Sequence, residues 1–161
     1  MDSKFIFLLY LWFRMAGYNL QRFLDAQQGI YEQALAEVKN GKKYSHWIWY
    51  IFPQLKGLGM SYNSQYYGIS SKEKAEAYLA HSVLGVRLRE ITSAFLQLKG
   101  KAAVDVFGGL DTMKVLSCMT LFNEVASDDL FQQVIDLYFQ GRPDETTKKI
   151  LNKKLESAGV L

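Results

Sequence analysis

Residues 84–98 read LGVRLREITSAFLQL and carry the clearest periodic pattern in the chain. Large apolar residues follow one another at steps of four, three, four and three, at Leu84, Leu88, Ile91, Phe95 and Leu98. Because an α-helix turns once in about 3.6 residues, such steps place these side chains on one helical face. The stretch therefore predicts an amphipathic helix that Gly100 would end.

Similar helix signals precede this stretch. Asn19 is a capping residue in front of an apolar stripe that runs to Val38, and Gly29 can divide the stripe into two helices. Asn40-Gly41 then supplies a C-terminal stop.

Further signals surround and follow residues 84–98. Ser70, with Glu73 three residues later, predicts the capped start of a short helix. Asp111 can cap a helix that runs to about Phe122, and Ser127 opens another that ends at Gly141. A last helix should begin near Pro143-Asp144. Six or seven helices with short connections predict a compact, single-domain, all-α protein.

Residues 45–54, SHWIWYIFPQ, are the ambiguous segment. Their aromatic and β-branched residues favour a strand, and so short an apolar run has no decisive period. Because the chain offers no second strand to pair with it, we predict a helix, apolar on nearly every side and therefore buried.

The composition is that of a globular domain, with 161 residues of which 49% are hydrophobic. The single cysteine, Cys118, cannot form an internal disulfide, which favours a reducing, cytoplasmic location. One cysteine and two distant histidines make no ligand cluster, so we predict no metal, and nothing in the sequence indicates a cofactor.

The charge is modest and local. The net charge is +3, and residues 142–154 alone carry five basic and two acidic residues, which leaves the rest of the chain neutral. Because a dedicated nucleic-acid binder should present a broader basic face, we predict a solvated terminal helix and no nucleic-acid partner.

The N-terminus needs a separate interpretation. Residues 5–13, FIFLLYLWF, are nine consecutive apolar residues, too few to span a bilayer, and no A-x-A-like cleavage site follows them. Met15 then opens a stretch that resembles an ordinary cytosolic start. We interpret residues 1–17 as an N-terminal extension, non-native or signal-like, and residues 18–161 as the helical domain; the sequence does not decide whether residues 1–14 are native. A signal or membrane-surface anchor, and a helix docked on the domain, remain alternatives; we predict no membrane partner.

The aromatic segment 45–54 is also the first candidate binding element. Trp47 and Trp49 offer flat stacking surfaces, and His46 and Gln54 add hydrogen-bonding groups. The alternative is that these aromatic residues simply fill the core.

Two further segments are candidates. The loop at residues 57–64, which includes Ser61, can offer backbone N–H groups to an anion, or be an ordinary turn. On the predicted helix after it, Lys114 and Ser117 share a face with Asp111, so that a cation and a hydroxyl can project together, as in a lysine-activated serine. Cys118 would pair with His46 only if the fold joined them; a buried, inert thiol is the alternative.

Several strings resemble a widespread, uncharacterised family. They are NLQRFLDAQ at residues 19–27, HWIWYIFPQ at residues 46–54, and the Asp111/Lys114/Ser117 pattern that ends in Met119-Thr120-Leu121-Phe122. The resemblance covers about residues 18–153. It implies a compact, all-helical, cytosolic domain of bacteria and eukaryotes without a named activity, and it supports a helix for residues 45–54. Some relatives carry an old "calpastatin" label, which this apolar and periodic chain does not fit, because such inhibitors are disordered.

The chain departs from the family pattern at two positions. Cys118 stands where relatives have a second serine, which weakens any required role of the thiol. Ser82 stands where relatives often have proline, which affects only a local turn.

Together these features predict a domain that binds a small anionic or nucleotide-like ligand. The expected binding residues are His46, Trp47, Trp49, Gln54, Ser61, Lys114 and Ser117. The alternative is a protein-interaction or scaffold domain without chemistry, and the sequence decides neither catalysis nor oligomeric state.

Overall fold

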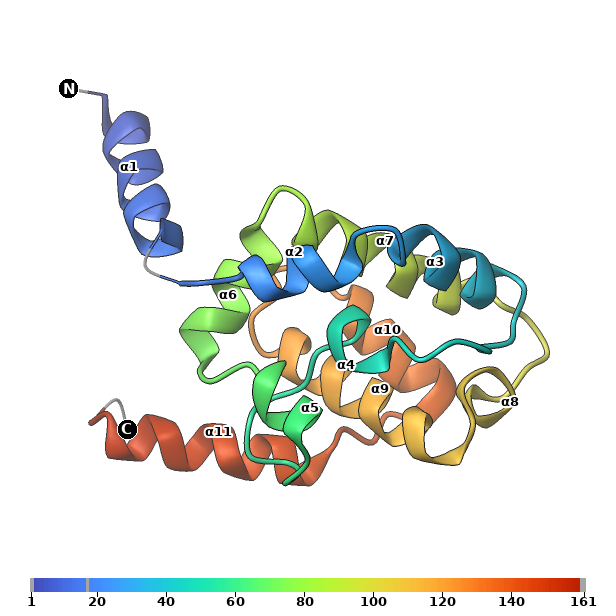
Figure 1. Ribbon diagram of the computed structural model, residues 1–161. Helices are drawn as coiled ribbons and strands as arrows, with labels where there is room; N and C mark the ends of the chain where they lie inside the picture. Colours follow the sequence, from blue (N-terminus) through green and yellow to red (C-terminus); the bar gives the residue numbers. More distant parts are fainter. Residues whose placement is uncertain (1, 17, 160–161) are drawn as a thin grey trace.

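Helices account for most of residues 2–16 and 18–159, which the computed structural model describes (Figure 1). Within these residues the helices are α1 (Ser3–Ala16), α2 (Gln21–Gln27), α3 (Tyr31–Lys39), α4 (Ile48–Ile51), α5 (Tyr62–Tyr66), α6 (Lys72–Ala80), α7 (Leu84–Leu96), α8 (Ala103–Phe107), α9 (Gly109–Asn123), α10 (Leu130–Phe139) and α11 (Glu145–Ser157). The described residues contain an isolated bridge between Leu55 and Ile69 but no strand.

The predicted all-α class is confirmed, but the predicted number of helices was too low. Eleven helices are present in the described part of the chain, against the six or seven expected. Two of the additional ones, α5 and α8, are only five residues long. A helix of one turn shows no repeated apolar face, so periodicity does not reveal it.

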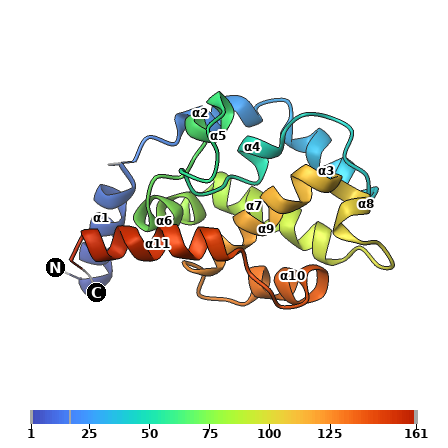
Figure 2. The same ribbon diagram turned by 90° about the horizontal axis from the view of Figure 1, so that it is seen from below.

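The centre of the protein is α9. Its residues from Val115 to Phe122 are all buried. The surrounding helices α4, α6, α8, α10 and α11 pack against it, and both views place it inside the bundle (Figures 1 and 2). A helix buried on all sides has no polar face, which is why α9 lacks the clear amphipathic pattern of α7.

The predicted helix at residues 84–98 forms, and its apolar face is buried. Leu84, Leu88, Ile91 and Phe95 lie in the core, where α7 packs against α3, α6 and α10. The helix ends at Leu96, so that Leu98 lies just beyond it and is only partly buried.

The ends of other helices test the capping predictions. Gly29 has a φ of 74° and separates α2 from α3, as predicted. The last helix, α11, begins at Glu145, next to the predicted start at Pro143-Asp144, and Asp144 is its cap. The cap of α6 is Ser71 and not Ser70, and α9 begins at Gly109, before the expected cap Asp111.

The ambiguous segment 45–54 is helical only at α4. Before it, the carboxylate of Glu37 on α3 accepts hydrogen bonds from five donors: the Tyr44 and Ser45 N–H groups, Ser45 Oγ, Trp47 Nε1 and Gln33 Nε2. These bonds fix the chain in an irregular course up to Trp47. The single turn of α4 follows, and the buried residues Phe52 and Pro53 come after it.

The first helix, α1, projects from the rest of the protein in Figure 1, and its residues 5–10 are exposed. The predicted extension ends at residue 17, which lies outside the described residues, as do residues 160–161 at the far end of the predicted domain. None of the described helices combines the length and the apolar character needed to cross a membrane.

The bonds to Glu37 yield a stability prediction. Glu37→Ala leaves the indole N–H of the buried Trp47 without its acceptor, so we expect a loss of roughly 2–4 kcal/mol in the free energy of unfolding, measured with urea at pH 7. Glu37→Gln keeps an acceptor oxygen but loses the charge, and should cost less.

The same carboxylate makes this loss depend on pH. Burial alone would raise the pKa of Glu37, but the hydrogen bonds from Ser45, Tyr44 and Trp47 outweigh it and lower the pKa from 4.5 to about 2. Stabilisation by the charge is therefore complete above pH 4.5 and disappears as the pH falls toward 2. The stability difference between wild type and Glu37→Gln should shrink over this interval; a constant difference would contradict the assignment.

A second prediction concerns Thr92 on α7. Its hydroxyl is buried without a hydrogen-bond partner among the described residues. Thr92→Val removes this polar group at nearly constant volume and should leave stability unchanged or raise it by up to about 1 kcal/mol. Thr92→Ser, which keeps the hydroxyl and deletes the methyl, should lower stability by about 1 kcal/mol. A clear loss in Thr92→Val would show that the hydroxyl is bonded after all.

Candidate functional site

A cavity of about 240 Å³ lies between α4, α5 and the first turns of α9. Most of its wall is apolar, and a few polar groups are set into it. The lining residues are Trp49, Gln54, Leu55, Leu58, Gly59, Ser64, Tyr67, Gly68, Leu110, Met113 and Lys114. An apolar hollow with a few convergent polar groups is the usual form of a small-molecule site.

A charged group stands at the edge of this cavity. The carboxylate of Asp111 lies between two ammonium groups, with Lys114 Nζ 2.8 Å from Oδ1 and Lys43 Nζ 2.8 Å from Oδ2. Each lysine also lies near an indole ring: Lys114 Nζ is 4.4 Å from the centroid of Trp49, and Lys43 Nζ is 5.1 Å from that of Trp47. Such cation–π contacts fix both ammonium groups in place.

The sharing of one carboxylate leaves a positive excess. Burial alone would raise the pKa of Asp111, but the hydrogen bonds from Lys114 and Lys43 outweigh it and lower the pKa. Asp111 is therefore ionised at neutral pH, and two cations share one anion. Lys114, one of these two cations, belongs to the wall of the cavity.

The structure divides the seven residues expected to bind a ligand. Trp49, Gln54 and Lys114 line the cavity together, from α4, from the segment after it and from α9. Trp47 does not line it: its side chain is fully buried and packs against Phe52 and Phe107. Residues 47 and 48 are buried and residues 49 and 50 are only partly buried, so the two tryptophans differ in burial.

The remaining expected residues lie elsewhere. His46 is exposed just before α4, and Ser61 is exposed at the N-terminus of α5, where its hydroxyl accepts a hydrogen bond from Ser64 N. Ser117 is buried, and its hydroxyl lies 3.0 Å from the Met113 carbonyl oxygen and 3.1 Å from Asp144 Oδ2. This side chain therefore supports the cap of α11 and does not pair with Lys114.

The thiol of Cys118 is not part of the site either. It is fully buried, and burial raises its pKa well above the ordinary value, so the reactive thiolate is suppressed. His46 lies on the surface, so the two side chains form no catalytic pair.

Sequence reasoning missed the apolar part of the wall. Leu110 and Met113 precede Lys114 on α9 and are 84% and 56% exposed, although they are large apolar residues. Leu110 and Met113 lie four residues and one residue before Lys114, and such large apolar side chains at the start of a predicted helix were an available signal. Tyr67 had no such signal, because only the fold brings it to α4.

Fold and cavity together define the class: a small all-α protein with an apolar hollow bordered by a lysine–aspartate–lysine group. Residues 17–151 match the family described as "Protein of unknown function (DUF1810)", and the chain belongs to this family.

One solved structure is similar throughout. It is the crystal structure of the conserved hypothetical protein Rv1873 from Mycobacterium tuberculosis, with 39% sequence identity and a TM-score of 0.83. The alignment covers 84% of this chain and 98% of that protein. No curated protein matches the sequence. The comparisons thus establish family and fold and supply no activity.

The different positions of the two tryptophans can be tested by substitution. Trp47→Ala empties a fully buried site and should lower the free energy of unfolding by about 3–5 kcal/mol. Trp49→Ala removes a partly buried cavity wall and should cost about 1–2 kcal/mol. Urea titrations of both variants measure the difference, and equal losses would contradict the assignment of Trp49 to a cavity and Trp47 to the core.

Proposed function

We propose that this protein binds a small anionic ligand with one flat ring in the cavity between α4, α5 and α9. The observation that carries the proposal is the position of Lys114, which is held at the cavity wall by Asp111 and by the face of Trp49. A ligand carboxylate or phosphate there would balance the positive excess of Lys43, Asp111 and Lys114.

The size of the cavity limits the ligand. Its 240 Å³ equal the volume of about eight water molecules at about 30 Å³ each. This space suits a single ring with a short substituent, such as an aromatic acid. A nucleotide would place its base in the cavity and its phosphate outside.

The walls favour a flat ring. The apolar side chains of Leu58, Leu110 and Met113 offer dispersion contacts, and Trp49 and Tyr67 offer aromatic surfaces. The side-chain amide of Gln54 has no hydrogen-bond partner among the described residues, so it is available to a polar group of the ligand. The proposal concerns binding and assigns no reaction.

A thermal-shift screen of aromatic acids and nucleoside monophosphates tests the proposal. Binding stabilises the native state by RT ln(1 + [L]/Kd), so a ligand at 100 times its Kd should add about 2.7 kcal/mol and raise Tm by several degrees. Lys114→Ala should abolish this shift. It should change the stability of the free protein by no more than about 1 kcal/mol, because the ion pair with Asp111 is partly exposed.

Lys39→Ala, at an exposed lysine on α3, is the matched control and should retain the full shift. Absence of any shift in wild type across the screen would overturn the proposal and favour the alternative of a protein-interaction domain. An equal loss of the shift in Lys39→Ala would show that binding depends on overall charge and not on the cavity.

A further inference from the structure

Residues 66–71 are bordered by cations that come from four separate parts of the chain. These are Arg22 of α2, Lys56 of the segment before α5, Lys74 of α6 and Lys154 of α11. We name Arg22, Lys56, Lys74 and Lys154 the basic strip. Its members are widely separated in the sequence, which is why no charge run revealed it.

Side-chain contacts place Arg22 and Lys154 along this short segment, backbone contacts place Lys56 and Lys74 beside it, and the charges of Arg22 and Lys56 act on Lys74. Arg22 Nε donates to the carbonyl oxygen of Tyr66 at 2.7 Å, and Lys154 Nζ donates to that of Ser70 at 2.5 Å. The Lys56 N–H donates to the Ile69 carbonyl at 2.8 Å, so that its chain runs beside the same residues. Lys74 follows in the first turn of α6, where its N–H donates to Ser71 Oγ.

The basic strip lacks compensating charge. None of its members forms an ion pair with a carboxylate in the part of the chain that the structure describes. Burial, together with the neighbouring charges of Arg22 and Lys56, lowers the pKa of Lys74, and burial lowers that of Arg22. Keeping partly buried cations together without a partner costs free energy, which an anionic ligand would recover.

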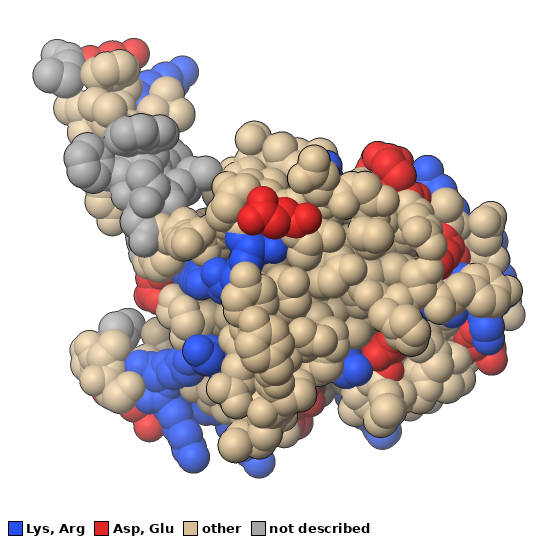
Figure 3. Space-filling model, in the orientation of Figure 1, with Lys and Arg blue, Asp and Glu red and all other residues tan. Residues whose placement is uncertain are grey.

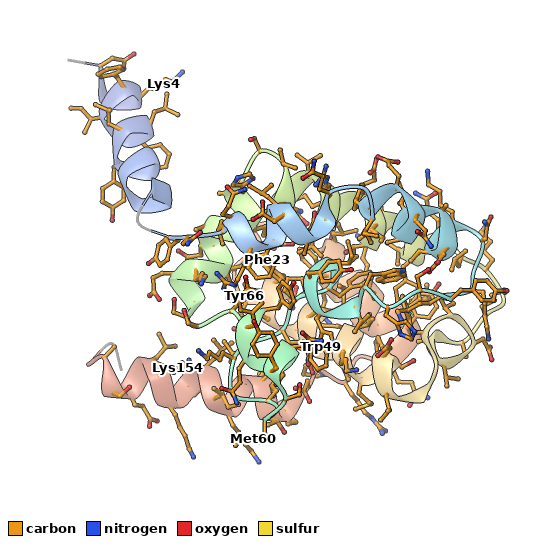
Figure 4. All side chains as sticks on the ribbon, viewed as in Figure 1. Lys4, Phe23, Trp49, Met60, Tyr66 and Lys154 are labelled. Carbon is orange, nitrogen blue, oxygen red and sulfur yellow. The ribbon has the colours of Figure 1, made fainter. Side chains whose placement is uncertain are left out.

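Exposed tyrosines adjoin the basic strip. Tyr62 and Tyr66, which are 75% and 44% exposed, stack with ring centroids 5.4 Å apart at an interplanar angle of 12°. Figure 3 shows Lys and Arg atoms gathered over α2, α6 and α11 on this face. In Figure 4, Lys154 lies on one side of α5, with Tyr66 near the middle and Trp49 on the other side. None of the four cations of the basic strip lines the cavity, although Tyr67 and Gly68 of the segment that they border do.

We propose that the basic strip binds the phosphate groups of a nucleotide, with a base stacked on the Tyr62–Tyr66 pair. The nucleotide is either free or part of a single strand, since both present the same phosphate and base. Cations that follow a phosphate backbone beside exposed aromatic faces are the usual means of binding single strands without reading their sequence. The sequence alone predicted no nucleic-acid partner because it could not show that the fold gathers these four side chains.

Fluorescence anisotropy with a labelled uridine octamer, and with labelled ATP as the free nucleotide, tests this proposal on the full chain. Lys74→Glu and Lys154→Glu should each weaken binding at least about fivefold and reduce its salt dependence, because phosphate contacts are lost. Tyr66→Ala should weaken it about tenfold through lost stacking, while Tyr66→Phe, which keeps the ring, should not. Stronger binding of the octamer than of ATP would identify a strand; the reverse would identify a free nucleotide.

Two controls separate this site from general charge and from the cavity. Lys99→Glu changes an exposed lysine in the α7–α8 connection, at the opposite end of the molecule, and should leave binding unchanged. Lys114→Ala removes the cavity lysine and should leave binding of the octamer unchanged, because Lys114 is not a member of the basic strip. Loss of ATP binding in this variant would place that nucleotide in the cavity and contradict its assignment to the strip. No binding of either probe, equal weakening by Lys99→Glu, or binding only to anionic phospholipid vesicles would each overturn the proposal.

Discussion

The carboxylate of Glu37 organises the region on which the candidate site depends. It ties the Tyr44 and Ser45 backbone and the Trp47 indole to α3, so that the chain enters the core without regular structure. Once Trp47 is fixed between Phe52 and Phe107, the single turn of α4 has only one orientation. In that orientation the partly buried Trp49 packs against the core and also lines the cavity. One partly exposed network thus accounts for the different positions of the two tryptophans.

A second carboxylate, that of Asp111 in the first turn of α9, connects this region to α9 through its ion pair with Lys43. Lys43 belongs to the segment that Glu37 organises, and Lys114 belongs to α9, yet both bind the one carboxylate. Lys43 lies over the indole of the buried Trp47, and Lys114 lies over that of Trp49 at the cavity. Cation–π contacts and a shared anion hold Lys114 in one position before any ligand arrives, which lowers the ordering cost of binding.

Local signals predicted the parts of the fold that depend on local physics. The apolar period of α7, the glycine between α2 and α3 and the start of α11 each follow from a few neighbouring residues. The one-turn helices α5 and α8 did not follow, because packing and not propensity stabilises them. For the site, Trp49, Gln54 and Lys114 were predictable as unusual polar and aromatic residues, but the separation of Trp47 from Trp49 was not. That separation depends on Glu37, eight or more residues away, and on Phe107 beyond α7.

The basic strip illustrates the limit of sequence reasoning most sharply. A charge that is solvated on an exposed helix costs the protein little and requires no explanation. Arg22 and Lys74 differ, because they are partly buried, lie near each other and have no carboxylate partner among the described residues. Folding has brought together cations that repel each other, at a position where a single acidic substitution would relieve the repulsion. Arrangements that oppose stability in this way persist where binding needs them, so the basic strip is better explained by a ligand than by the fold.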